Sequence, residues 1–130
     1  MSFDQIELNL SNIKENVRKI CLESGRDPRR INILAVSKGQ TLDAIREAYR
    51  VGHNNFGENY VQEAKEKIDH VSTANWHFIG AIQSKKTKEI AKNFDWVHSV
   101  DSEKLARKLS EHRDPKRGKL KIFIQVNTSE

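Results

Sequence analysis

The sequence has few of the residues that mark several classes of protein. One cysteine in 130 residues excludes an internal disulfide and a zinc site built from several cysteines. Two prolines and six glycines are too few for a collagen-like or low-complexity chain. No apolar run approaches the roughly 20 residues that a membrane-spanning helix needs, and the N-terminus lacks the pattern of a secretory signal. We therefore expect a single domain, residues 1–130, in the reducing environment of the cytoplasm.

The motifs of several common ligand sites are also absent. The sequence contains no GxGxxG or GxxxxGK[ST] phosphate loop, no GxSxG nucleophile turn and no HExxH metal motif. These absences argue against a dinucleotide-binding enzyme, an ATPase, a serine hydrolase and a metalloenzyme.

Positive charge is in modest excess. Lysine and arginine number 23 against 18 acidic residues, for a net charge of +5. The densest basic stretches, Lys85–Lys88 and Arg113–Lys119, contain no aromatic residue of the kind that stacks on nucleic-acid bases. We interpret them as a solvated helix face and a surface loop, and we expect no nucleic-acid partner.

Apolar residues recur with the period of a helix over residues 3–24, and Gly25 supplies a stop. Cys21 lies on the apolar stripe, and we expect it to be a small buried side chain. Five short apolar runs then predict strands at residues 31–36, 54–57, 76–80, 96–100 and 119–126. Helical patterns separate the strands, which begin roughly 20–24 residues apart.

This alternation predicts an α/β fold with a parallel sheet, because each repeat holds one strand, one helix and two short loops. Two architectures fit: an open doubly wound sheet, or a parallel (β/α)8 TIM-type barrel of which the chain supplies an N-terminal helix and about five βα units. A full barrel needs about 250 residues. The fifth strand is the most apolar, and nothing follows to cover it. We therefore expect a truncated N-terminal part of a barrel, able to self-associate through the uncovered strand.

Polar and ionisable side chains follow every predicted strand, at the edge where parallel α/β folds form their sites. They are Ser37 and Lys38, Glu58 and Asn59, Gln83 and Ser84, Ser99 and Asp101, and Asn127 to Ser129. The central candidate is Lys38, which directly follows an apolar strand. A lysine there either is partly desolvated, with a nucleophilic amine suited to imine formation with an aldehyde, or extends into solvent from a loop. Position alone leaves both alternatives open.

Histidines are weaker candidates. His77 and His98 lie in predicted strands, where a hydrogen-bonded structural role is the simpler interpretation. His53, His70 and His112 lie in loops or on helix surfaces. No ligand spacing links the five, so we expect no metal site.

Five motifs occur together in an order and spacing found in a known family. They are Ile33–Lys38 (ILAVSK), Phe56–Glu63 (FGENYVQE), Trp76–Gly80 (WHFIG) with Gln83, Phe94–Trp96 (FDW) with Ser99–Asp101, and Ile124–Asn127 (IQVN). Together they resemble the pyridoxal phosphate homeostasis protein family, also described as YggS/PROSC-type PLP-binding proteins. The resemblance runs from the first helix to the last residue and concerns the N-terminal half of that family.

The resemblance implies a pyridoxal 5'-phosphate (PLP) barrel of fold type III, similar to the N-terminal domain of alanine racemase. It implies that Lys38 carries PLP as a Schiff base. Asn59, His77, Gln83–Ser84 and Asn127 would lie around the cofactor.

Two departures from the family pattern matter. Lys85 stands where the family often has asparagine, which weakens the case for a polar contact from that position. The family's phosphate-binding residues lie beyond residue 130. We therefore expect a full-length parent to bind PLP and this chain alone to bind it loosely.

The resemblance also implies a function in intracellular PLP (vitamin B6) homeostasis. Such a protein carries or regulates PLP without an established reaction, is monomeric within the family, and has PLP-dependent apo-enzymes as recipients. The alternative is a PLP-dependent racemase or lyase acting on amino acids, and a third interpretation is a basic interaction module in which Lys38 is incidental. We favour the first, because amino-acid catalysis needs an acid–base group on the substrate side of the ring, which alanine racemase takes partly from a separate domain.

Overall fold

The computed structural model describes residues 2–129. After helix α1, strands and helices alternate along the chain. The elements are α1 (Phe3–Glu23), η1 (Pro28–Arg30), β1 (Ala35–Val36), α2 (Leu42–Arg50), β2 (Asn55–Glu58), α3 (Val61–His70), β3 (Asn75–Phe78), η2 (Ser84–Lys86), α4 (Thr87–Asn93), β4 (Trp96–Val100), α5 (Glu103–His112), η3 (Pro115–Arg117) and β5 (Lys121–Ile124).

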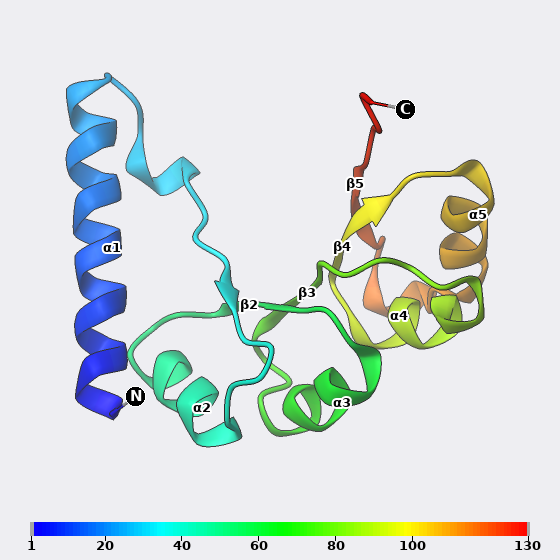
Figure 1. Ribbon diagram of the computed structural model, residues 1–130, viewed down its shortest axis with the longest axis horizontal. Coiled ribbons are helices and arrows are strands. Elements are labelled where there is room, and N and C mark those ends of the chain that lie inside the picture. The colour runs from blue at the N-terminus through cyan, green and yellow to red at the C-terminus, as the bar shows by residue number, and fades with distance from the viewer. Residues whose placement is uncertain (1, 130) are drawn as a thin grey trace.

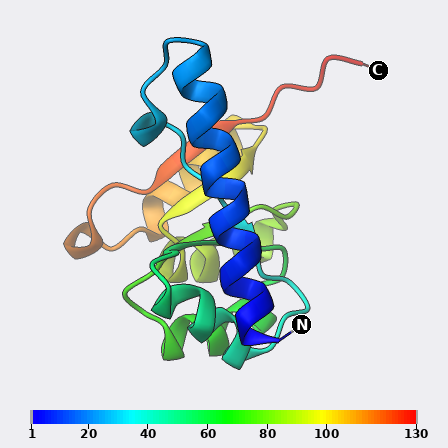
Figure 2. The same ribbon diagram turned by 90° about the vertical axis from the view of Figure 1, so that its left-hand side faces the viewer.

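The five strands form one sheet in the order β1-β2-β3-β4-β5, and every pair is parallel, as the repeat predicts. Sequential order is that of a barrel wall, whereas a doubly wound sheet reverses its order at a switch point. The sheet is not closed into a barrel, and helices α2 to α5 follow its outer side (Figure 1). Helix α1 crosses the β1 end of the molecule and packs against α2 (Figure 2).

Local signals in the sequence set the helix ends. The Thr41 hydroxyl accepts from the Ala44 N–H at 3.1 Å and caps α2, and the Ser102 hydroxyl accepts from the Leu105 N–H at 3.2 Å and caps α5. Gly25 follows the end of α1 with a φ of 70°, a conformation that costs glycine little. Gly25 is the stop that the sequence predicts.

The core lies between the sheet and its outer helices. From the strands, Phe56, Trp76, Phe78 and Val97 are each at most 2% exposed. The helices contribute Ile45, Ala64, Ile90 and Leu109, which are likewise buried. Because alternate strand residues point to opposite faces, the residues between these positions face the inner, concave side. Cys21 is buried as predicted.

The first predicted strand differs from the structure. Residues 31–36 are expected to form a strand buried on both faces, but only Ala35–Val36 pair with β2, and Val36 is 51% exposed. The prediction of double burial is wrong because β1 is an edge strand, with β2 as its one strand partner among residues 2–129. Apolar composition alone does not distinguish an edge strand from a central one.

The fifth strand is apolar and uncovered, as predicted, but shorter than residues 119–126. It spans Lys121–Ile124, and Phe123 and Ile124 are 52% and 75% exposed. Among residues 2–129 its one strand neighbour is β4. The apolar stripe of α1 is also less buried than its periodicity suggests, because Ile13 and Ile20 are exposed.

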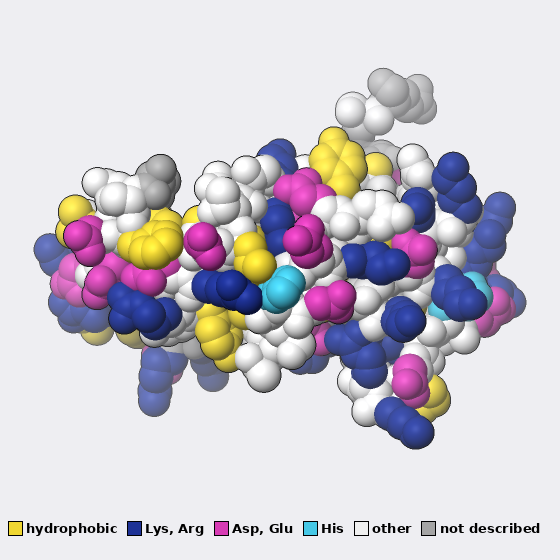
Figure 3. All heavy atoms as spheres, turned by 90° about the horizontal axis from the view of Figure 1, so that it is seen from below, with side chains coloured by type: hydrophobic (Ala, Val, Ile, Leu, Met, Phe, Trp, Pro, Cys, Tyr) yellow, Lys and Arg dark blue, Asp and Glu magenta, His cyan; other side chains and the backbone are white. Residues whose placement is uncertain are grey.

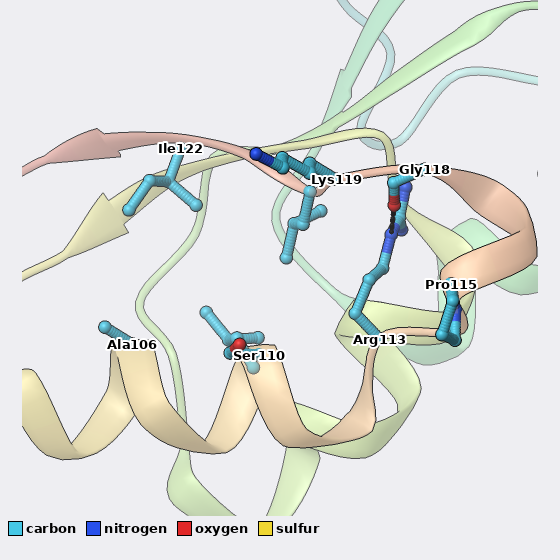
Figure 4. Close-up of a pocket in the computed structure, with 9 residues that line it drawn as sticks. Ala106, Ser110, Arg113, Pro115, Gly118, Lys119 and Ile122 are labelled. Carbon is cyan, nitrogen blue, oxygen red and sulfur yellow. Dashed lines mark hydrogen bonds between the residues drawn. The ribbon is translucent and has the colours of Figure 1, made fainter.

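A groove between α5 and β5 shows why one basic stretch is structural. Apolar side chains of both elements line it, and Arg113 lies at its end (Figure 4). The Arg113 guanidinium donates to the carbonyls of Ala91 and Phe94, each at 2.7 Å, and to that of Gly118 at 3.0 Å. Burial lowers the pKa of Arg113 from its ordinary value. Arg113 therefore ties the end of α5 to the end of α4.

Charges of both signs cover the outer surface. On the helix side, lysine and arginine side chains are interspersed with aspartate and glutamate (Figure 3). This pattern agrees with the interpretation of the basic residues as a solvated surface. In the described part of the chain, no helix combines the length and the apolar character needed to cross a membrane.

Candidate functional site

The carboxyl ends of β2, β3 and β4 are held together at one edge of the sheet. The Ser99 hydroxyl donates to the Gly80 carbonyl at 2.5 Å, which joins β4 to the residues after β3. A Cβ atom at Gly80 would overlap the carbonyl oxygen of Asn59, so the segments after β2 and β3 are in close contact. This edge, with the turn after β1, is the rim on which the sequence predicts a small-molecule site.

Lys38 lies on this rim, in the turn that follows β1 and Ser37. Its side chain is exposed, so of the two alternatives left open by the sequence, the structure has the lysine that extends into solvent from a loop. The preceding strand, β1, is an edge strand with β2 as its one strand neighbour among residues 2–129. Among residues 2–129 no carboxylate pairs with the Lys38 ammonium. The amine is therefore accessible and unpaired.

The backbone on both sides of Lys38 is fixed by hydrogen bonds. The Ser37 N–H donates to the Gly57 carbonyl at 2.9 Å, and the Ser37 hydroxyl donates to Glu58 Oε2 at 2.6 Å. The Gly39 N–H donates to Glu63 Oε1 at 2.5 Å. Gly39 has a φ of 72°, which a residue with a side chain rarely adopts.

A buried ammonium lies at the centre of these contacts. Lys67 Nζ donates to Glu58 Oε1 at 2.9 Å, to Glu63 Oε1 at 2.8 Å and to the Ser37 carbonyl at 2.8 Å. The side chains of Lys67 and Glu58 are 8% and 0% exposed. Burial alone would lower the pKa of Lys67, but its hydrogen bonds to the two carboxylates outweigh that effect and raise it. The bond to Lys67 lowers the pKa of Glu63, so this pair stays ionised.

Lys67, Glu58 and Glu63 form a buried charged cluster, here called the Lys67 cluster, which was not predicted from the sequence. One signal was available: Lys67 occupies the same helical face as Val61, Ala64 and Ile68, which form the buried stripe of α3. A lysine on a buried stripe needs partners of opposite charge. Glu63, four residues earlier, is one, but Glu58 lies on a strand, and only the fold brings it into contact.

His77 belongs to a polar and aromatic layer on the concave face of the sheet. Its Nδ1 lies 2.9 Å from His98 Nε2, and its Nε2 lies 3.2 Å from Asn55 Oδ1. Its ring stacks on Trp96 with centroids 5.4 Å apart, and Trp96 in turn stacks on Phe123 with centroids 5.5 Å apart. Both nitrogens of His77 therefore have protein partners, in agreement with the structural role that the sequence favours for it.

Because His77 is buried next to His98, we expect the free energy of unfolding to depend on pH. Burial and the neighbouring His98 lower the pKa of His77 to about 4. Because this value is below that of the unfolded chain, the unfolded state binds more protons as the pH falls. The stability that neutral His77 contributes to the folded state is complete above about pH 6.5 and is lost as the pH falls toward 4. We expect His77 to cost on the order of 1–2 kcal/mol of unfolding free energy at pH 5 relative to pH 7.

Urea denaturation at pH 7 and pH 5 measures this loss. His77→Gln should lose less stability than the wild type between these pH values, whereas His112→Gln, at an exposed position on α5, should lose as much as the wild type. An equal loss in the wild type and His77→Gln would contradict the assignment.

The remaining predicted site residues, Asn59, Ser84 and Asn127, do not line one common hollow. Asn59 directly follows β2 and, with Tyr60, Gly80 and Gln83, lines a hollow on the rim. Ser84 begins η2 with an exposed side chain and does not line that hollow. Asn127 lies three residues after the end of β5, exposed, and accepts from the Gln125 amide at 3.3 Å.

Comparison with known sequences identifies relatives along nearly the whole chain. A sequence profile of the alanine racemase N-terminal domain matches residues 8–130. A pyridoxal phosphate homeostasis protein from Vibrio alginolyticus is 42% identical over 130 residues, covering 95% of this chain and 56% of that protein. The protein of the same name from Pseudomonas aeruginosa is 46% identical over 123 residues, covering 93% and 54%. The chain thus spans about half the length of the curated relatives it matches.

Solved structures share the fold. PipY from Synechococcus elongatus PCC7942 with PLP bound is 42% identical, with a TM-score of 0.60 over 77% of this chain and 47% of that one. PipY without PLP gives a TM-score of 0.62 at 38% identity, over 74% and 46%. A protein from Bifidobacterium adolescentis, at 24% identity and a TM-score of 0.74 over 84% of this chain and 49% of that one, shows likeness of fold alone.

Proposed function

Because the chain belongs to the alanine racemase N-terminal domain family, we propose that it binds PLP as a Schiff base on Lys38 and takes part in intracellular PLP (vitamin B6) homeostasis. Relatives at 42–46% identity are named pyridoxal phosphate homeostasis proteins, and a similar protein has been solved with PLP bound. The observation that carries the proposal is the position of Lys38 after the carboxyl end of β1, with hydrogen bonds fixing the backbone on both sides and no carboxylate partner among residues 2–129.

The residues on the rim fit the aldehyde end of the cofactor. PLP supplies an aldehyde that condenses with a primary amine and releases water. Lys38 offers such an amine, exposed and without a carboxylate partner in the described part of the chain. Asn59 lies on the same rim and is the polar side chain that we propose beside the ring. We propose less direct roles for Ser84 and Asn127, which lie apart from that hollow, and a supporting role for His77 on the concave face of the sheet.

The chemistry of the rim supports binding and release of PLP over amino-acid turnover. A catalytic PLP site needs a group that takes a proton from the substrate. His77 does not meet this need, because both of its ring nitrogens already have partners. Beside Lys38 itself, the other proposed side chains, Asn59, Ser84 and Asn127, do not titrate in the relevant range. We therefore propose PLP-dependent apo-enzymes as recipients, in the cytoplasm.

Absorbance spectroscopy tests the proposal. On addition of PLP, the wild-type chain should develop a visible Schiff-base band that is lost in Lys38→Ala. Lys85→Ala, at an exposed position on η2, should keep the band. The same band in Lys38→Ala, or no band in the wild type, would overturn the proposal. A Schiff base that turns over amino acids at useful rates would favour the racemase or lyase alternative.

A further inference from the structure

We propose that Lys67 and Glu63 are positioning residues for the Lys38 amine, acting through the two peptide groups that flank Lys38. The inference rests on the proposed function, because it assigns these residues to the same site. Lys67 donates to the Ser37 carbonyl on one side of Lys38, and Glu63 accepts from the Gly39 N–H on the other.

These two contacts determine the backbone conformation of Lys38. The Ser37 carbonyl belongs to the peptide group before Lys38, and the Gly39 N–H belongs to the peptide group after it. When both groups are fixed in space, the φ and ψ angles of Lys38 are fixed as well. The direction in which the Lys38 side chain leaves the backbone is then set by α3, which carries Lys67 and Glu63.

The Lys67 ammonium has one acceptor for each of its three N–H donors. An ammonium has three N–H donors and no acceptor. Lys67 Nζ has three acceptors within 2.8–2.9 Å, which are Glu58 Oε1, Glu63 Oε1 and the Ser37 carbonyl. Hydrogen bonds to an ionised group are stronger than neutral ones, so the Ser37 carbonyl has a firm donor. The planar guanidinium of arginine does not present three donors from one atom.

Glu63 extends the cluster to the second peptide group. One of its oxygens, Oε1, accepts from both Lys67 Nζ and the Gly39 N–H, at 2.8 and 2.5 Å. Gly39 adopts a φ of 72°, the left-handed conformation that glycine tolerates best. At this turn of the chain, the Gly39 N–H is bonded to the Glu63 carboxylate on α3.

The cluster exceeds what packing of α3 requires. The other residues of the buried stripe of α3 are apolar, and a buried ion pair is often replaced by apolar side chains at no loss of stability. A buried lysine with two carboxylates is costly to desolvate. The contacts of Lys67 and Glu63 reach the residues on both sides of Lys38, namely Ser37 and Gly39. A reactive amine held in one orientation reaches the cofactor aldehyde without loss of backbone freedom.

Glu63→Ala is the sharpest test, because the Glu63 side chain is 35% exposed and its loss leaves Lys67 paired with Glu58. Glu66→Ala, an exposed residue on the same helix, is the matched control. We expect Glu63→Ala to raise the Kd for PLP about tenfold and to speed amide hydrogen exchange at Gly39 without added PLP. Glu63→Gln, which retains an acceptor oxygen, should recover part of both effects.

Both readouts are taken well below the thermal midpoint of each variant, so that an unfolded fraction does not contribute. A wild-type Schiff-base band together with unchanged PLP affinity in Glu63→Ala would overturn the inference and leave the proposed function intact. Unchanged exchange at Gly39 would also overturn it. If the wild type gives no band, the proposed function itself fails, and the positioning role fails with it.

Discussion

Lys67→Met should lower the free energy of unfolding by about 3–5 kcal/mol, the usual effect of removing one partner of a buried ion pair. Glu58 is 0% exposed, and the substitution leaves its carboxylate in the protein interior with the Ser37 hydroxyl as its remaining donor. The Ser37 carbonyl also loses its ammonium donor. Urea denaturation at pH 7 measures the difference.

A second substitution separates the charge from the packing. Lys67→Met combined with Glu58→Gln removes both charges, and the amide oxygen of glutamine still accepts from Ser37. We expect the double variant to recover most of the lost stability, because uncompensated charge is the main cost. Lys65→Met, on the same helix but outside the cluster, should change stability little. A double variant as unstable as Lys67→Met would show that the ion pair is not the cause.

Gly80→Ala is the second large expected effect, with a loss of about 3 kcal/mol. A Cβ atom at this position would overlap the Asn59 carbonyl oxygen. The overlap is with backbone, so no side-chain rotation relieves it. The segment after β3 is also held by the Ser99 hydroxyl, which donates to the Gly80 carbonyl. The segments after β2 and β3 must therefore move apart, which displaces Asn59 from the rim.

Gly25→Ala is the comparison variant for Gly80→Ala. Gly25 has a φ of 70°, and no atom lies within 4 Å of the position that a methyl group would take there, so the substitution tests backbone conformation without overlap. We expect it to cost about 1 kcal/mol. Denaturation curves that place Gly80→Ala no lower in stability than Gly25→Ala would show that the close approach to Asn59 is not constraining.

The sequence was sufficient to predict the architecture, because the signal was repeated. Five strands separated by four helices at a nearly constant spacing predict parallel strands, and the structure has them. The spacing left two architectures open, and the sequential strand order of the structure is that of a barrel wall. The same parallel order explains why the rim could be predicted: the carboxyl ends of β1 to β5 share one edge of the sheet. Single strands were predicted less well, since the apolar residues 31–36 give an edge strand of two residues.

The environment of Lys38 could not be predicted, because it depends on which strand lies at the edge. An apolar strand before a lysine is compatible with a buried or an exposed amine, and in the part of the chain that the structure describes β1 has β2 as its one strand neighbour. The contacts of Lys67 were hidden for another reason. They join residues 9 and 30 positions apart in the chain, and such pairs are defined only by the packing of α3 against the sheet.

Chemical trapping tests the central claim most directly. The chain is mixed with an equimolar amount of PLP, reduced with borohydride so that any imine becomes a stable secondary amine, digested and mapped by mass spectrometry. We predict that the label lies on the peptide containing Lys38, and that Lys38→Ala loses this label without gaining it elsewhere. Label spread over the exposed lysines in proportion to their accessibility, or concentrated on a lysine away from the rim, would contradict the claim.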